Sequence, residues 1–234
     1  MEELFYKDAY IKHFEAEVVE VIDKKYIILS QTTFYPQSGG QPHDIGVLTK
    51  DGEVYEICYV SKFNNHILHE NEKHGLKKGD KIKGEINWDK RYKLMRMHTA
   101  AHVLSAVLFN ETKALITGNQ LSDDISRIDF SLENFNKDKI QEYINIANNY
   151  IKKDLQVKSY FISRKEADSM EQLSKLAKGL SLEIKNIRIV EIISLDKQGD
   201  GGTHVNSLKE IGLIKLERLE NKGTKNRRIY FSLN

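Results

Sequence analysis

The feature that most constrains the fold is a change of sequence pattern near Trp88. Before it, short β-branched or alternating segments are separated by turn signals such as Asp51-Gly52, which predicts strands. The predicted strands are Glu15 to Val21, Tyr26 to Ser30, Gly46 to Thr49, Glu53 to Val60, His66 to Glu70 and Lys81 to Trp88. A small β-barrel is the natural way to close so many strands. We therefore expect a barrel domain over residues 1–88.

After Trp88 the chain alternates between helical and strand-like patterns. The stretch from Arg91 to Phe109 is rich in Ala and Leu and lacks Gly and Pro, which favours a helix. Further helices are expected at Lys137 to Lys153 and Arg164 to Leu176, and strands at Ser126 to Leu132, Val157 to Phe161, Ile187 to Ile193, Gly212 to Leu219 and Arg227 to Leu233. This pattern predicts a second domain, residues 89–234, with an antiparallel sheet flanked by helices. The whole chain is expected to be α+β.

The composition is that of a globular chain outside membranes. The chain has 234 residues, of which 40% are hydrophobic and 30% charged, and these values suit two modest domains. No apolar run approaches the roughly 20 residues of a membrane span, and the first residues lack the pattern of a signal peptide. Cys58 is the single cysteine, so no internal disulfide can form, and we expect it to pack within its strand. A cytoplasmic location is expected.

The charge balance excludes a strongly basic nucleic-acid binder. A formal net charge of +2 means that any contact with nucleic acid must come from a local patch. One candidate patch lies near the end of the chain, with Lys215, Arg218, Lys222, Lys225, Arg227 and Arg228. Because Glu217 and Glu220 dilute it, an ordinary solvated face is an equally good interpretation.

Two pairs of potential metal ligands lie about a hundred residues apart. His98 and His102 have i, i+4 spacing in the predicted helix, so both imidazoles share one face and form half of a tetrahedral zinc site. Asp200 and His204 can supply the other half, because Gly199, Gly201 and Gly202 allow a tight backbone with positive φ. For any single histidine, the alternative is a packed residue of the core.

Four motifs, in order, carry a resemblance to a known family. They are Thr33-Phe-Tyr-Pro-Gln-Ser-Gly-Gly-Gln-Pro-His-Asp-Ile-Gly46, Met97-His-Thr-Ala-Ala-His102, Arg127-Ile-Asp-Phe130, and Gly201-Gly-Thr-His-Val205 followed by Glu210-Ile-Gly212. The chain resembles the editing half of alanyl-tRNA synthetases and the free-standing AlaX editing proteins, and its length is similar to their medium-size type. The resemblance implies a trans-editing hydrolase that deacylates mischarged seryl-tRNA(Ala), with glycyl-tRNA(Ala) as a further candidate. It also implies tRNA, and neither DNA nor a membrane, as the partner.

The resemblance implies one zinc ion (Zn²⁺) per chain, held by His98, His102, His204 and Asp200. The family commonly has Cys where this chain has Asp200. A carboxylate oxygen can replace the thiolate, so Asp200 binds the metal directly or hydrogen-bonds to a histidine that does. When bound, the zinc either activates a water and polarises the ester carbonyl or orients the substrate, and the sequence does not choose between these roles.

Further residues are candidates for substrate contact or catalysis. The three histidines and Thr203 are the candidate catalytic residues, and Thr203 and Thr99 can hydrogen-bond the seryl hydroxyl that distinguishes serine from alanine. The resemblance implies that the glycine-rich motif, Ser38 to Asp44, helps to shape the amino-acid pocket. The remaining candidates for substrate contact are Gln41, His43, Asp44, Thr32, Thr33 and Gln120, and the last is expected in a Thr-Gly-Asn-Gln turn after the helix. As alternatives, Thr99 bonds its own i−4 carbonyl, His43 is only a loop residue, and the motif is a plain hairpin loop.

Two other functions compete with editing. One is a metal-stabilised tRNA-binding module that has lost hydrolysis, with Asp200 as the sign of that loss. The other is an unrelated metallohydrolase, which the sequence disfavours because Thr99 occupies the position of the catalytic Glu in a zincin HExxH motif.

Overall fold

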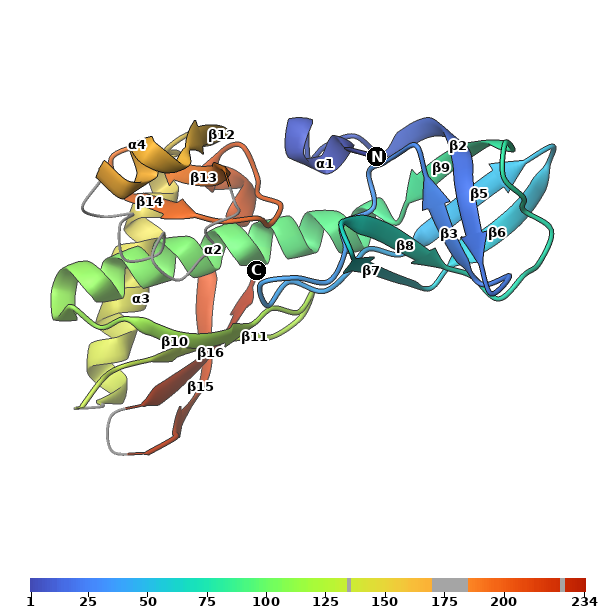
Figure 1. Cartoon of the computed structure of the whole chain (residues 1–234). Helices are drawn as coiled ribbons and strands as arrows, with labels where there is room; N and C mark the ends of the chain where they lie inside the picture. Colours follow the sequence, from blue (N-terminus) through green and yellow to red (C-terminus); the bar gives the residue numbers. More distant parts are fainter. Residues whose placement is uncertain (134–135, 170–184, 224–225) are drawn as a thin grey trace. The chain divides into compact units, whose positions relative to one another are not determined.

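The chain divides into two units, Met1–Met95 and Arg96–Asn234 (Figure 1). The structure is a computed structural model and describes residues 1–133, 136–169, 185–223 and 226–234. The division falls inside the helix α2 (Trp88–Thr112), whose first residue is where the sequence pattern places the domain boundary. The limits of the expected domains, residues 1–88 and 89–234, therefore stay predictions.

The N-terminal unit is built on a seven-stranded antiparallel sheet. The order is β6-β5-β9-β2-β3-β8-β7, with bounds Glu53–Ile57, Gly46–Lys50, Lys81–Ile86, His13–Ile22, Tyr26–Leu29, His66–Glu70 and Tyr59–Phe63. The first half of β2 pairs with β9 and the second half with β3, and a β-bulge between Val18 and Glu20 lies at the start of the pairing with β3. Such a bulge bends a strand, so one long strand serves both halves of the sheet.

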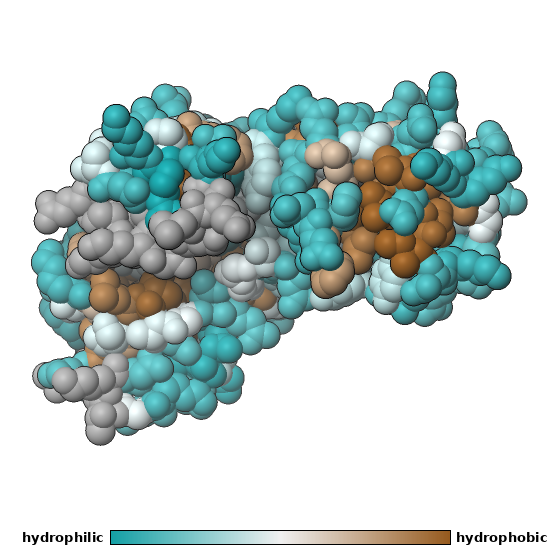
Figure 2. All heavy atoms as spheres, in the orientation of Figure 1, coloured by the Kyte–Doolittle hydropathy of each residue, from teal (hydrophilic) through white to brown (hydrophobic). Residues whose placement is uncertain are grey.

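The sheet encloses one apolar core, to which its strands contribute residues such as Phe14, Leu29, Leu48 and Ile67. Figure 2 shows that hydrophilic side chains cover much of the visible surface, with an apolar patch on the N-terminal unit. Within the described residues, no pairing joins the edge strands β6 and β7, so the closed barrel stays a prediction. A two-stranded parallel sheet, β1 (Glu2–Glu3) with β4 (Gln31–Thr32), and the short helix α1 (Leu4–Lys7) complete the unit.

The single strand expected at Glu53 to Val60 is wrong. Two strands replace it, because β6 ends at Ile57 and β7 begins at Tyr59. The buried positions explain the break. Tyr55 and Ile57 are two residues apart and share one face of a strand, whereas Ile57 and Val60 are three apart and would face opposite sides of a single continuous strand. Cys58 lies at the break and is exposed, so the expectation that it packs inside a strand is also wrong.

Helix α2 begins at a side-chain cap and ends before a residue with left-handed backbone. The side chain of Asn87 accepts the backbone N–H of Lys90 at 3.1 Å, as a helix N-cap does. The helix contains no Gly or Pro and ends before Lys113, whose φ of 61° is left-handed. Among the described residues, no helix is long and apolar enough to cross a membrane.

The C-terminal unit contains two antiparallel sheets, where one was expected. The first has the order β10-β11-β16-β15, with bounds Ile116–Gln120, Ser126–Phe130, Arg227–Leu233 and Ile214–Asn221. The second has the order β12-β13-β14, with bounds Val157–Ser163, Asn186–Ile192 and Asp196–Gly199. Together with the helices, these sheets confirm the α+β class.

Helix α3 (Lys137–Lys152) packs beside β15. Its buried side chains lie on one helical face, at Ile140, Tyr143, Ile144, Ala147 and Ile151. Asn148 exchanges two hydrogen bonds with the backbone of Ile214, at 2.9 and 2.8 Å, which fixes the helix along the strand. Helix α4 (Arg164–Ser169) forms the start of the helix expected at Arg164 to Leu176, and the rest of that range lies outside the described residues.

Candidate metal centre

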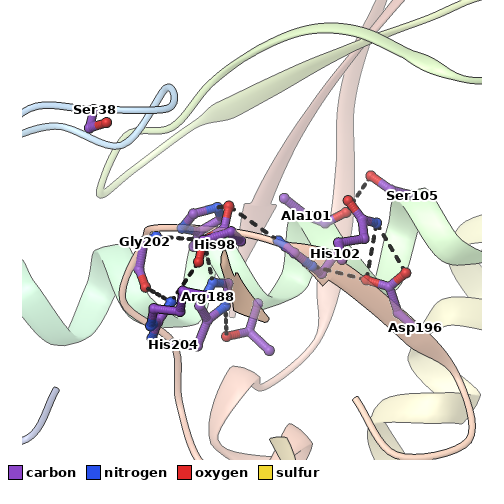
Figure 3. Close-up of polar contacts among 12 residues, drawn as sticks. Ser38, His98, Ala101, His102, Ser105, Arg188, Asp196, Gly202 and His204 are labelled. Carbon is purple, nitrogen blue, oxygen red and sulfur yellow. Dashed lines mark hydrogen bonds and ion pairs between the residues drawn. The ribbon is translucent and has the colours of Figure 1, made fainter. Parts of the chain in front are cut away.

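His98 and His102 project from α2 toward the segment that carries Asp200 and His204 (Figure 3). The two rings are 5.3 Å apart between centroids, and both residues are buried, as the i, i+4 spacing predicts for a shared face. The Nε2 atom of His98 lies 3.4 Å from Oδ2 of Asp200, and Nε2 of His102 lies 3.8 Å from the same oxygen. The carboxylate of Asp200 therefore faces both imidazoles of the helix.

The segment after β14 turns by hydrogen bonds and not by left-handed glycines. None of Gly199, Gly201 and Gly202 has a positive φ, so that expectation is wrong. Oδ1 of Asp200 accepts the backbone N–H of Gly202 at 2.5 Å, which forms an Asx-type turn. Nη1 of Arg188, on β13, donates to the carbonyl oxygens of Asp200 and Gly202, each at 2.9 Å. The turn brings Nε2 of His204 to 3.1 Å from Oδ1 of Asp200.

The four side chains have the composition and spacing of a metal site. One ligand atom from each of His98, His102, Asp200 and His204 lies within 4.8 Å of the others. Zinc bonds of 2.0–2.1 Å would set tetrahedral ligands about 3.3 Å apart, close to the shorter distances here. Three imidazole nitrogens and one carboxylate oxygen are ligands that divalent transition metals accept. The cluster can hold a metal ion, and the expected convergence of the four side chains is confirmed.

The pKa values in the cluster suit metal binding at two of the four positions. Burial by itself would raise the pKa of Asp200, but the neighbouring histidines, His98 first among them, hold it well below its usual range. Burial, together with the charge of His98, lowers the pKa of His204 well below its usual range. Asp200 is thus an ionised carboxylate and His204 a neutral imidazole, and these are the forms that bind metals.

Hydrogen bonds hold the outer nitrogens of two of the histidines. Nδ1 of His102 lies 2.9 Å from Oδ2 of Asp196, and Nδ1 of His204 lies 3.2 Å from Oγ1 of Thr99. Oγ1 of Thr99 also accepts the backbone N–H of Val205 at 3.2 Å. Burial opposes protonation of His102, yet hydrogen bonds with Asp196 and Asp200 outweigh it and raise the pKa of His102 to about 10. Sequence reasoning missed both Asp196 and Arg188.

Thr99, expected to contact the substrate, therefore lies against His204, a candidate metal ligand. Thr203, the neighbour of His204, is fully buried. The contact of either threonine with a seryl hydroxyl stays a prediction.

The candidates in the glycine-rich motif and beside it lie in the N-terminal unit. Ser38 and Gln41 bracket a two-residue turn in which Gly39 and Gly40 have φ values of 58° and 89°, the left-handed pair that a type I′ turn requires. Nδ1 of His43 lies 2.9 Å from the carbonyl oxygen of Asp44, and the ring of His43 packs edge-on against Tyr59 at 4.5 Å.

Three of these candidates have their polar atoms in the interior of the N-terminal unit. The carboxylate of Asp44 accepts hydrogen bonds from Arg91 and from the backbone N–H of Tyr35. Oγ1 of Thr32 lies 2.8 Å from Nε2 of His69, and both residues are fully buried. Thr33 is also fully buried. Substrate contact by these residues stays a prediction.

Gln120 lies in β10, and not in a turn as its Thr-Gly-Asn-Gln sequence suggests. Its Oε1 accepts from Nε of Arg127 at 3.1 Å. It lines a cavity of about 490 Å³ together with Ser122, Ile125, Arg127, Arg228 and Tyr230, none of which belongs to the cluster. Its contact with the substrate stays a prediction.

The basic residues near the end of the chain are mostly engaged. Nε and Nη2 of Arg228 bond Asp129 at 2.7 and 2.8 Å, and Arg227 is buried and donates to backbone carbonyls such as that of Glu133. Lys215 and Lys222 pair with Glu217 and Glu220 at 3.2 and 2.7 Å. Lys225 lies outside the described residues. These contacts favour the interpretation as an ordinary solvated face.

Comparisons with known proteins agree with the motifs. A family model described as "tRNA synthetases class II (A)" matches residues 5–90, and one described as "Threonyl and Alanyl tRNA synthetase second additional domain" matches residues 187–230. The alanine–tRNA ligase of Pyrobaculum aerophilum is 37% identical over 93% of this chain, which spans 25% of the ligase.

Shorter relatives match over their whole length. The Alanyl-tRNA editing protein AlaX-M of Methanosarcina barkeri is 51% identical over 99% of this chain and 98% of its own. The protein of the same name from Saccharolobus solfataricus is 44% identical, again over 99% of this chain and 98% of its own. Because the similarity extends over both chains almost completely, the protein belongs to the AlaX-M family of alanyl-tRNA editing proteins.

Proposed function

We propose that this protein hydrolyses the ester bond between serine and the 3′ end of alanine tRNA, with glycine as a second amino acid removed, at a zinc ion. That it is an editing enzyme, an aminoacyl-tRNA deacylase, follows from its family. The proposed reaction at a zinc ion rests on one observation, the cluster of three buried histidines and Asp200 in the C-terminal unit. A metal held by this cluster could assist acyl transfer to water by polarising the ester carbonyl.

Zinc suits this set of ligands better than the harder cations do. Mg²⁺ and Ca²⁺ take oxygen ligands almost exclusively, whereas zinc accepts imidazole nitrogen together with a carboxylate. Four donors within 4.8 Å correspond to the coordination number that zinc prefers. When bound, the metal supplies a Lewis acid that polarises the ester carbonyl or orients the substrate.

The exposure of the four side chains of the cluster indicates the side from which a substrate can approach. The side chains of His98, His102 and His204 are 6%, 8% and 4% exposed, whereas that of Asp200 is 20% exposed. Solvent and substrate therefore reach the cluster past Asp200, the position where the family commonly has Cys. Asp200 would hold the ion from the side of that opening.

Selection of serine over alanine requires a polar group that pairs with the seryl hydroxyl. Thr203 is our candidate for this role because it lies next to His204. Thr99 is the other candidate, and its hydroxyl oxygen is 3.2 Å from Nδ1 of His204, which supports a role in holding that ring. An unpaired buried polar group costs about 1–3 kcal/mol, which is enough to disfavour alanine by about 5- to 150-fold.

The test is the release of labelled serine from seryl-tRNA(Ala), with alanyl-tRNA(Ala) and glycyl-tRNA(Ala) measured in parallel. We expect rapid release of serine, slower release of glycine and little release of alanine, and loss of activity on treatment with a chelator or in His102→Ala. His66→Ala is a matched control, since His66 is an exposed histidine in the N-terminal unit. Protein that binds zinc and tRNA but releases no serine above the uncatalysed rate would contradict hydrolysis and favour a tRNA-binding module.

A further inference from the structure

Asp196 contacts a candidate metal ligand from the outside. Its Oδ2 lies 2.9 Å from Nδ1 of His102, while Nε2 of the same ring faces Oδ2 of Asp200 at 3.8 Å (Figure 3). The imidazole thus lies between two carboxylates, one facing each ring nitrogen. Only the Asp200 side belongs to the cluster of four side chains.

Asp196 is itself held in place. It is the first residue of β14 and pairs with Ile192 of β13, and its side chain is only 10% exposed. Nε2 of Gln198 lies 3.0 and 3.1 Å from its two carboxylate oxygens. An amide on one side and an imidazole on the other leave this carboxylate little freedom to turn.

The contact with Asp196 selects which nitrogen of His102 keeps its proton when the ring binds a metal in its neutral form. An ionised carboxylate accepts hydrogen bonds but donates none, so Nδ1 of His102 must carry a proton to bond Asp196. In the neutral ring, Nε2 then has the lone pair and points into the cluster, as a metal ligand must. A carboxylate on the outer nitrogen also raises the basicity of the inner one.

We propose that Asp196 is a positioning residue of the metal centre, which fixes His102 with Nδ1 protonated and Nε2 directed at the ion. The inference rests on the metal site of the proposed function and extends it to a residue outside the four ligands. Gln198 supports it by holding the carboxylate from the other side. The ring of His102 then needs no reorientation when the ion binds.

The test measures the zinc affinity of the full chain by competition with a chromophoric chelator, in the absence of tRNA. Asp196→Asn is expected to weaken zinc binding about 10- to 100-fold, because the amide can present a donor to Nδ1 and so favour the wrong tautomer. Glu191→Gln is the matched control, since Glu191 lies on the neighbouring strand β13, accepts from the hydroxyl of Tyr160, and loses the same charge. It is expected to bind zinc like the unsubstituted protein.

A double-mutant cycle separates positioning from a general loss of charge or stability. If Asp196 acts through His102, Asp196→Asn adds no further loss of zinc affinity in the His102→Ala background. Gln198→Ala provides a second variant, with a smaller loss that also disappears in that background. Circular dichroism of the metal-free proteins shows which variants are folded and therefore interpretable.

Three outcomes would overturn the inference. They are an unchanged zinc affinity in both the folded Asp196→Asn and Gln198→Ala proteins, equal losses with and without His102, or an unsubstituted protein that takes up no zinc. The last outcome removes the metal site as well, whereas the first two leave zinc binding and serine release intact in the unsubstituted protein.

Discussion

Arg91 donates hydrogen bonds to both carboxylate oxygens of Asp44, and both side chains are fully buried within the N-terminal unit. The guanidinium also donates to the carbonyl oxygens of Ala9 and Thr33, at 2.9 and 2.5 Å. Asp44, at the end of the glycine-rich motif, is therefore tied to α2 and to two other segments.

We expect Arg91→Met and Asp44→Asn each to destabilise the N-terminal unit by about 3–5 kcal/mol, because each variant leaves a buried polar partner without its counterpart. Urea unfolding followed by the fluorescence of Trp88, the only tryptophan, would measure the change. Lys83→Ala is the control: its pair with Glu15 is exposed and 3.9 Å long, so it contributes about 0–1 kcal/mol. A loss below about 1 kcal/mol for Arg91→Met would contradict this account.

Stability should also depend on His69 in mildly acidic solution. Burial lowers the pKa of His69 from 6.5 to about 4, and the neutral ring bonds the carbonyl of Ile27 and the hydroxyl of Thr32. Between these pH values the unfolded chain binds more protons than the folded one, so stability falls as the pH decreases from 6.5 to 4. The full loss is about 3 kcal/mol, at about 1.4 kcal/mol per pKa unit.

The check on this prediction is the free energy of unfolding measured at pH 7 and at steps down to pH 4. His69→Gln should have a shallower dependence on pH over this range, whereas His66→Gln, at an exposed position of β8, should keep the original slope. Equal slopes for the protein and its His69→Gln variant would contradict the prediction.

Thr99 can be assigned to the metal or to the substrate by comparing Val and Ser in its place. If its hydroxyl holds Nδ1 of His204, Thr99→Val weakens zinc binding by about tenfold and Thr99→Ser preserves it. If it instead contacts serine, zinc affinity stays constant and the preference for seryl- over alanyl-tRNA falls. Chelator competition and deacylation rates on the same preparations would decide, and we expect the first result.

Asp200 should behave as a direct ligand of the ion. We expect Asp200→Ala to weaken zinc binding at least about 100-fold. Substitution of a residue that only hydrogen-bonds a ligand typically weakens metal binding by about 10- to 100-fold. Asp200→Cys should restore binding, because a thiolate is a softer ligand that zinc binds well. Asp123→Ala, at an exposed aspartate, provides the control. Zinc binding by Asp200→Ala at the original affinity would leave three histidines as the whole site.

Local patterns in the sequence were sufficient for the helix that carries His98 and His102. The i, i+4 spacing of His98 and His102 predicted a shared helical face, because that geometry depends only on the helix repeat. Most strands of the first half were also predicted, although two strands replace the one expected at Glu53 to Val60. Propensity failed at Gln120, where pairing of β10 with β11 overrides a sequence typical of a turn.

Contacts between remote segments were beyond the reach of the same reasoning. Asp196 is 94 residues from His102, and no spacing rule relates a β-strand terminus to a position on a distant helix. The turn at Asp200 was expected to depend on glycine conformation, but the carboxylate of Asp200 and the guanidinium of Arg188 bend it instead. Side-chain hydrogen bonds of this kind depend on three-dimensional placement.

The imidazole between Asp196 and Asp200 also limits which side chains can replace His102. An amide side chain ends in one oxygen and one nitrogen on a single carbon, so it cannot give a proton to Asp196 and a lone pair to the ion across the width of a ring. Asparagine or glutamine at this position would satisfy one neighbour and leave the other unmatched. We therefore expect position 102 to tolerate substitution poorly, for reasons of reach and polarity more than of volume.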